Sequence, residues 1–218
     1  MPQKTFNNLP AERQQEILCV AYREFTLNDY QTASLSRIIK NLGLAKGSFY
    51  RYFRSKRELY FFLLERSTRE RFEKVEERIN DPELDLFELL LINWKDKIEY
   101  ETSHPVESGF FYRVLRERYN EEVGDLEFRL KHEITLKVER LIRENYTESV
   151  RKDIDPFLLA FAIVQFQFAL YDYLAIRYND DLVQNLLQEK SLFTLHEEEV
   201  IKLITDFTSI VKNGISNN

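Results

Sequence analysis

The chain has 218 residues, of which 44% are hydrophobic and 31% are charged. This balance is that of a folded protein with one sizeable core or two unequal ones, and it excludes an intrinsically disordered chain. Five glycines and five prolines leave little turn chemistry for hairpins, and no segment alternates apolar and polar residues with period two. We therefore expect an all-α fold.

Membrane and secreted classes find no support. The longest uncharged run, residues 156–171, has 16 residues and falls short of the roughly 20 apolar residues that a bilayer span needs. The N-terminus has no apolar core of a signal peptide. Cys19 is the single cysteine, so no intramolecular disulfide can form, and we expect it to be a small buried residue of the first helix. These features predict a cytoplasmic protein with no membrane partner.

Charge is distributed unevenly along the chain. Residues 1–60 contain ten basic and five acidic residues, whereas the whole chain has a net charge of −6. The first 60 residues are therefore at +5 and the remainder at −11. Between Ser34 and Arg57 there are seven basic residues and no acidic one. A run of charge can be only a solvated helix face, but this distribution also suits a polyanion-binding head on an acidic body.

The head is expected to consist of helices joined by short turns. The first covers residues 10–27, and the second follows Ser34, whose hydroxyl should cap it. Gly43 should end the second helix in a left-handed conformation, and a third helix is expected over 45–53. Ser55 opens a fourth in an S-x-x-E capping box. The second and third helices, joined by a glycine turn and basic on the outer face, predict a helix-turn-helix that enters a major groove.

The residues expected to contact DNA lie on or beside the third of these helices. Lys46 and Arg51 are expected to donate to guanine O6 and N7. Gly47 lets the backbone approach the duplex closely, and Ser48 can bond either a base or a phosphate. Phosphate contacts are expected from Ser34, Tyr50, Tyr52 and Lys56.

The segment SLSRIIKNLGLAKGSFYRYFRSKRELY resembles the DNA-binding signature of the tetracycline-repressor (TetR) family. The shared features are a Ser or Thr cap, an Ile in mid-helix, a Gly followed by an aliphatic residue, K-G-S-F-Y-x-Y-F, and S-K-x-x-L. The resemblance covers residues 10–65. It implies an N-terminal three-helix helix-turn-helix head, placed at residues 1–56, and a C-terminal helical-bundle ligand and dimerisation domain, placed at 57–218.

Three positions depart from the family pattern. Ile39 and Leu42 stand where the family usually has alanine, so the second helix packs bulkier groups against its neighbours. Ala45 stands where Ser or Thr commonly caps the recognition helix, so that cap is missing.

The body is expected to contain five further helices. Asp81-Pro82 should end the fourth helix and cap a fifth, and Pro105 should open a short aromatic helix. A long charged helix is expected over residues 120–146. Asp155-Pro156 should start the helix over 156–178, and the last helix should end before Gly214.

The helix over 156–178 is apolar nearly all round, so two of its sides must be covered. One side can face its own domain, and the other needs a partner or the remaining helices. The resemblance implies a homodimer in which two C-terminal helices of each subunit form a four-helix interface. The expected interface residues are Phe166, Tyr173, Leu203 and Phe207, and a monomeric core wrapped by its own helices is the alternative.

Aromatic residues make up 14% of the chain. Aromatic walls with a few polar anchors suit a small-molecule site, although an aromatic stripe at helical spacing is more often core. The resemblance also implies an effector pocket in the body. The ligand-binding residues that we expect are Trp94, Phe111, Gln165 and Phe168, and the effector should be apolar and bulky because no cluster of bases in the body suggests a small anion.

No enzymatic, cofactor or metal motif is present in the sequence, because the glycines fit no nucleotide-binding loop and the histidines are scattered. The sequence predicts a ligand-responsive transcriptional repressor. It should bind a palindromic double-stranded DNA operator as a homodimer and be released by a small apolar effector. The alternative is a helical ligand-binding or interaction module whose basic head contacts another polyanion without sequence specificity.

Overall fold

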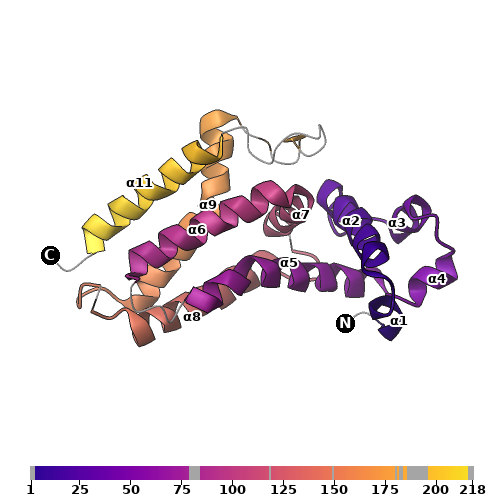
Figure 1. Ribbon diagram of the computed structural model, residues 1–218, viewed down its shortest axis with the longest axis horizontal. Helices are drawn as coiled ribbons and strands as arrows, with labels where there is room; N and C mark the ends of the chain where they lie inside the picture. The colour runs from indigo at the N-terminus through magenta and orange to yellow at the C-terminus, as the bar shows by residue number, and fades with distance from the viewer. Residues whose placement is uncertain are drawn as a thin grey trace.

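The computed structural model describes residues 3–78, 84–117, 119–148, 150–179, 181, 184–185 and 196–215. Every named element in these ranges is a helix, and Asn120 and Gly124 form an isolated bridge. The expected all-α fold is confirmed. Helices α1 to α4 gather at one end of the molecule, and α5 leads from them along the body (Figure 1).

The head contains α1 (Lys4–Asn7), α2 (Ala11–Leu27), α3 (Leu35–Asn41) and α4 (Lys46–Tyr50). Helix α1 was not predicted from the sequence. Gly43 has a φ of +61°, as expected for the residue that ends α3. Cys19 lies exposed on α2, contrary to our expectation, because Ile17, Leu18 and Ala21 occupy the buried face there.

Helix α4 is shorter than the expected 45–53. Ala45 stands at its N-cap and makes no side-chain capping hydrogen bond. After Tyr50 the chain turns before the next helix begins. The missing cap that the sequence shows at Ala45 therefore goes with a recognition helix of only five residues.

Helix α5 (Lys56–Arg78) connects the head to the body. Its start is confirmed as a capped end, since the Glu58 amide donates to Ser55 Oγ at 3.1 Å and the Glu58 carboxylate accepts from the Arg54 amide. The expected domain boundary between residues 56 and 57 falls at the first turn of this helix and stays a prediction.

The body contains α6 (Leu86–Ser103), α7 (Pro105–Leu115), α8 (Leu126–Asn145), α9 (Pro156–Tyr178) and α11 (Glu197–Ile215). Pro105 opens α7 as expected, and Asp155 caps α9 ahead of Pro156 by accepting from the Phe157 amide at 3.0 Å. Packing joins α8 with α9, α2 with α7, and α6 with α11.

Three predicted helix ends in the body are wrong. Helix α6 begins at Leu86 because Asp85 forms a full capping box with Glu88, whereas Asp81-Pro82 lies outside the described residues. Helix α8 begins only after Asp125, because Gly124 (φ +79°) closes a turn just before it. Helix α11 continues through Gly214.

Within the described ranges no single helix is long and apolar enough to cross a membrane. One bent pair, Pro156–Leu170 with Asp172–Tyr178, passes that test together, but its two parts meet at 42°.

Candidate nucleic-acid interface and effector cavity

Helix α4 divides its side chains between the core and solvent. Phe49 is fully buried, and so is Phe53 in the turn that follows. Lys46, Gly47 and Arg51 are exposed, in agreement with a face that is free to meet DNA. Tyr50 is also exposed, and Ser48 is half-buried. The structure thus brings five of the predicted DNA-binding residues onto one short, basic segment.

Helix α1 supports the end of α4 from behind. The Gln3 amide donates to the Tyr52 carbonyl at 2.9 Å, and the Thr5 hydroxyl donates to the Arg51 carbonyl. The Tyr52 ring is half-buried and meets the Phe6 ring edge-on, at 6.3 Å between centroids. These contacts hold the main chain at Arg51 and Tyr52 against α1.

A shallow hollow beside α4 adds a basic residue that the sequence analysis did not single out. Lys4 lines it together with Arg51 and Arg54. Lys4 precedes the first predicted helix by several residues, so no local pattern in the sequence joins it to α4.

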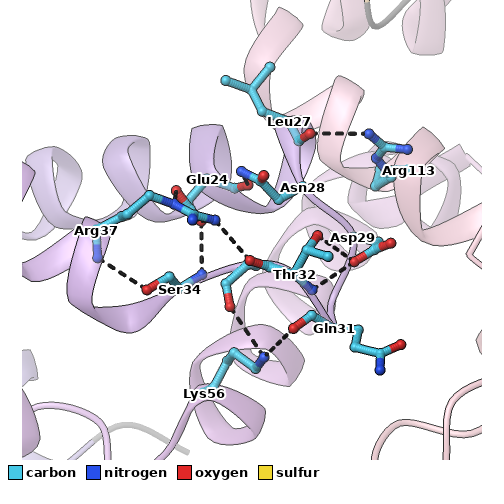
Figure 2. A network of polar contacts seen from close by, with 11 residues as sticks. Glu24, Leu27, Asn28, Asp29, Gln31, Thr32, Ser34, Arg37, Lys56 and Arg113 are labelled. Atoms are coloured by element: carbon cyan, nitrogen blue, oxygen red, sulfur yellow. Dashed lines mark hydrogen bonds and ion pairs between the residues drawn. The ribbon is translucent and has the colours of Figure 1, made fainter.

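A buried carboxylate holds the start of α3 (Figure 2). Glu24 on α2 is only 8% exposed and accepts from the Ser34 amide at 2.8 Å. It also accepts from Arg37 Nε at 2.9 Å and from Arg37 Nη2 at 2.6 Å. Ser34 Oγ in turn accepts from the Arg37 amide at 3.4 Å. Ser34 therefore caps α3, as expected, and Glu24 ties that cap to α2.

Glu24 and Arg37 are structural residues of the interface that the sequence analysis missed. An acid between the buried positions Ala21, Tyr22 and Phe25 was the available signal, because a buried carboxylate requires a partner.

Lys56 faces the turn between α2 and α3 (Figure 2). Its Nζ donates to the Gln31 carbonyl at 3.3 Å and to the Ala33 carbonyl at 3.2 Å, and it lies 4.6 Å from the centroid of the Tyr30 ring. This ammonium group thus stabilises the turn that precedes α3. A contact from Lys56 to phosphate stays a prediction.

The same turn contains a second fixed carboxylate. Asp29 accepts from the Thr32 amide at 2.8 Å and from its hydroxyl at 2.6 Å. These hydrogen bonds hold the pKa of Asp29 below its ordinary value.

The head is attached to the body by polar contacts around α7. Arg113 donates to the carbonyls of Thr26 and Leu27 at 3.1 and 3.3 Å, so a cation satisfies the C-terminal end of α2. Glu117, just beyond α7, accepts from the Tyr30 amide and from the Tyr60 hydroxyl. Burial raises the pKa of Glu117 above its ordinary value.

The body contains an aromatic cavity of about 360 Å³ between α5, α6, α7, α8 and α9. Three of the four predicted ligand-binding residues line it, namely Trp94, Phe111 and Phe168. Gln165 instead lines a neighbouring hollow of about 190 Å³, and Gln167 lines the aromatic cavity.

Two polar atoms among the cavity-lining residues lack a hydrogen-bond partner in the described part of the chain. They are Thr68 Oγ1 on α5 and Asn93 Oδ1 on α6, and both atoms are buried. An unsatisfied buried polar group costs roughly 1–3 kcal/mol. A ligand with a polar group at this point would recover that free energy.

The predicted dimer residues differ in exposure. Phe166, Leu203 and Phe207 are half-buried, whereas Tyr173 is 44% exposed. The rings of Phe166 and Phe207 stack on each other, and their centroids lie 5.4 and 5.7 Å from that of Trp94. Other apolar side chains of α9 and α11 are well exposed, and they are Leu158, Phe161, Ile176 and Ile210.

Comparison with known proteins identifies the head. Residues 17–61 match the family model of the bacterial regulatory proteins of the tetR family. No curated protein matches the chain. Helices α2, α3 and α4 all fall at least partly within the matched residues.

Solved structures match over the whole chain. A TetR family transcriptional regulator from Chloroflexus aurantiacus J-10-FL is 26% identical, with a TM-score of 0.70 and all of both chains covered. A TetR-like transcriptional regulator from Rhodococcus sp. RHA1 is 19% identical and shares the fold, with a TM-score of 0.64 and 95% and 100% of the two chains covered. The family match over residues 17–61 shows that the head is a DNA-binding domain of the tetR family of bacterial regulatory proteins, and the whole chain shares the fold of TetR family transcriptional regulators.

Proposed function

We propose that the protein is a ligand-responsive repressor that binds a palindromic DNA operator as a homodimer and leaves it when a small effector fills the body cavity. The observation that carries the proposal is the exposed basic segment at α4, whose end is hydrogen-bonded to Gln3 and Thr5 of the α1 region, while Glu24 holds the start of the neighbouring α3. Direct base contacts are assigned to Lys46 and Arg51, and phosphate contacts to Tyr50 and Lys4.

Homodimerisation is supported by the exposed apolar faces of α9 and α11. Ile176 is 85% exposed and Leu158 60% exposed, although both belong to the most apolar of the described helices. Burial of one such side chain is worth about 1.5–3 kcal/mol. A second copy that covers these faces would place two heads on one duplex, about 34–36 Å apart for successive major grooves.

The test begins with selection of bound fragments from genomic DNA by the full-length protein. Fluorescence anisotropy then compares a recovered duplex with a scrambled duplex of equal length and composition. The repressor predicts a preferred site with two-fold symmetry, and the alternative of a non-specific polyanion-binding module predicts equal affinities. Arg51→Ala should reduce the preference, and Lys152→Ala, which removes an exposed base of the body, serves as the matched control.

A further inference from the structure

The aromatic cavity adjoins a second hollow that runs between α5 and α8. This groove has a volume of about 560 Å³, and it shares four lining residues with the cavity. The shared residues are Thr68, Leu130, Glu133 and Lys137. They mark the point where a molecule lying among the aromatic side chains could extend towards solvent along α5.

The charge of this lining differs from that of the body around it. Residues 61–218 have a net charge of −11, counted from the sequence. Five basic and three acidic side chains line the two hollows together. The basic ones are Arg69, Lys97, Arg129, Lys137 and Arg140. Lys97 is paired with the buried Glu101 at 3.8 Å, whereas the other four bases are exposed at the rim of the hollows. This basic rim on an acidic body attracts an anion.

Lys137 is placed to meet that anion. Among the described residues no carboxylate lies within ion-pair distance of its Nζ, and the same holds for Arg69 and Arg129. Glu133 lies one turn from both Arg129 and Lys137 on α8, so the two bases offset its charge. Across the groove, the buried Thr68 hydroxyl has a hydrogen to donate and no partner in the described chain.

We propose that the effector is an amphipathic carboxylate, an inference that rests on the function proposed above. Its apolar part lies among Trp94, Phe111 and Phe168, and its carboxylate lies where the two hollows meet. There the carboxylate accepts from the Lys137 ammonium group and the Thr68 hydroxyl. Asn93 can donate a further hydrogen bond to the carboxylate, because a 180° rotation of its side-chain amide exchanges the positions of Nδ2 and Oδ1. The charged end thereby contacts α5, the helix that leads to the head.

The test uses the full-length protein and two probes that differ only in their polar end, decanoate and 1-decanol. The single tryptophan, Trp94, lines the cavity, so its fluorescence reports binding directly. Decanoate should bind about tenfold more tightly than decanol, as expected for a charged hydrogen-bonded end. Lys137→Met should abolish most of this preference by weakening the binding of decanoate alone. Thr68→Val, added to Lys137→Met, should lower the ratio of decanoate to decanol affinity further. Lys152→Met, an exposed base outside both hollows, is the matched control.

Several outcomes would overturn the assignment. Equal binding of acid and alcohol would show that the cavity selects apolar bulk alone. An equal loss for both probes in Lys137→Met would show that Lys137 supports the fold and not the anion. Failure of both probes to change Trp94 fluorescence would remove the site. Operator binding is measured separately, so tight decanoate binding with unchanged operator affinity would support this site and contradict the proposed switching function.

Discussion

Replacement of Glu24 by alanine tests whether this buried carboxylate holds α3 in place. The change removes the acceptor of the Ser34 amide and leaves the Arg37 guanidinium with only the Thr32 carbonyl, which accepts from its Nη2 at 2.8 Å. The Arg37 side chain is 51% exposed and can be rehydrated, so the main cost is the Ser34 amide left without its acceptor. A hydrogen bond to a charged group is worth about 1.5–3 kcal/mol. We therefore expect a loss of about 1.5–3 kcal/mol.

The conservative variant separates charge from hydrogen bonding. Glu24→Gln keeps an acceptor for the Ser34 amide and loses only the charge that holds Arg37, so its loss should be about half as large. Urea unfolding followed by circular dichroism measures the free energy of unfolding. Hydrogen exchange of the α3 amides shows whether the loss is local to that helix. Because α3 packs against α4, operator affinity should also fall. The affinity falls about tenfold for each 1.4 kcal/mol of binding free energy that is lost.

Glu24 does not hold α3 if the free energy of unfolding of Glu24→Ala is within about 0.5 kcal/mol of the wild-type value, a difference common for surface substitutions. Unchanged exchange of the α3 amides with a fall in operator affinity would also contradict this role, because the carboxylate would then act on DNA binding by another route.

The remaining predictions concern DNA contacts, assembly and pH. Arg51→Ala should cost about 1–3 kcal/mol and relax base preference at one operator position, measured by anisotropy on singly substituted operators; a uniform loss would assign Arg51 to phosphate. If Lys56 contacts phosphate, Lys56→Ala should reduce the slope of the logarithm of operator affinity against the logarithm of salt concentration by about one unit. Weaker binding with an unchanged slope would show that Lys56 only stabilises the turn before α3. Ile176→Glu should give monomers in sedimentation, since a charge would be buried in the proposed interface, and an unchanged dimer mass would place the interface elsewhere. Because burial raises the pKa of Glu117, the folded state binds the Glu117 proton more tightly than the unfolded state does. The free energy of unfolding of the wild type, measured relative to Glu117→Gln, should therefore fall as the pH rises from the unfolded-state pKa to the folded-state pKa. A difference between the two proteins that does not vary with pH would contradict the burial of that carboxylate.

Local signals in the sequence predicted much of the head and some helix ends of the body. The caps at Ser34, Ser55 and Asp155 and the left-handed Gly43 depend on residues within one turn of each other. Such contacts can be predicted from the order of the residues alone. The start of α6 also depends on a local signal, the capping box between Asp85 and Glu88, which the prediction of a cap at Asp81 overlooked.

Contacts between distant residues could not be predicted in this way. Glu24 meets Arg37 across 13 residues of chain, and Lys56 reaches Gln31 across 25. Phe166, expected at a dimer interface, stacks on Phe207 of the same chain. A periodicity shows which face of a helix is apolar, but which partner covers that face depends on how the helices are arranged in space.

The attachment of the head restricts how an effector could move it. Arg113 holds the C-terminal end of α2, and Glu117 holds Tyr30 and Tyr60, so the head cannot turn freely about the start of α5. A shift of the head therefore has to carry α7 or α5 with it. Both helices present a residue to the aromatic cavity, Phe111 from α7 and Thr68 from α5. A ligand there touches the two supports of the head at once, and it shifts the equilibrium only as far as it binds one arrangement of them more tightly than the other.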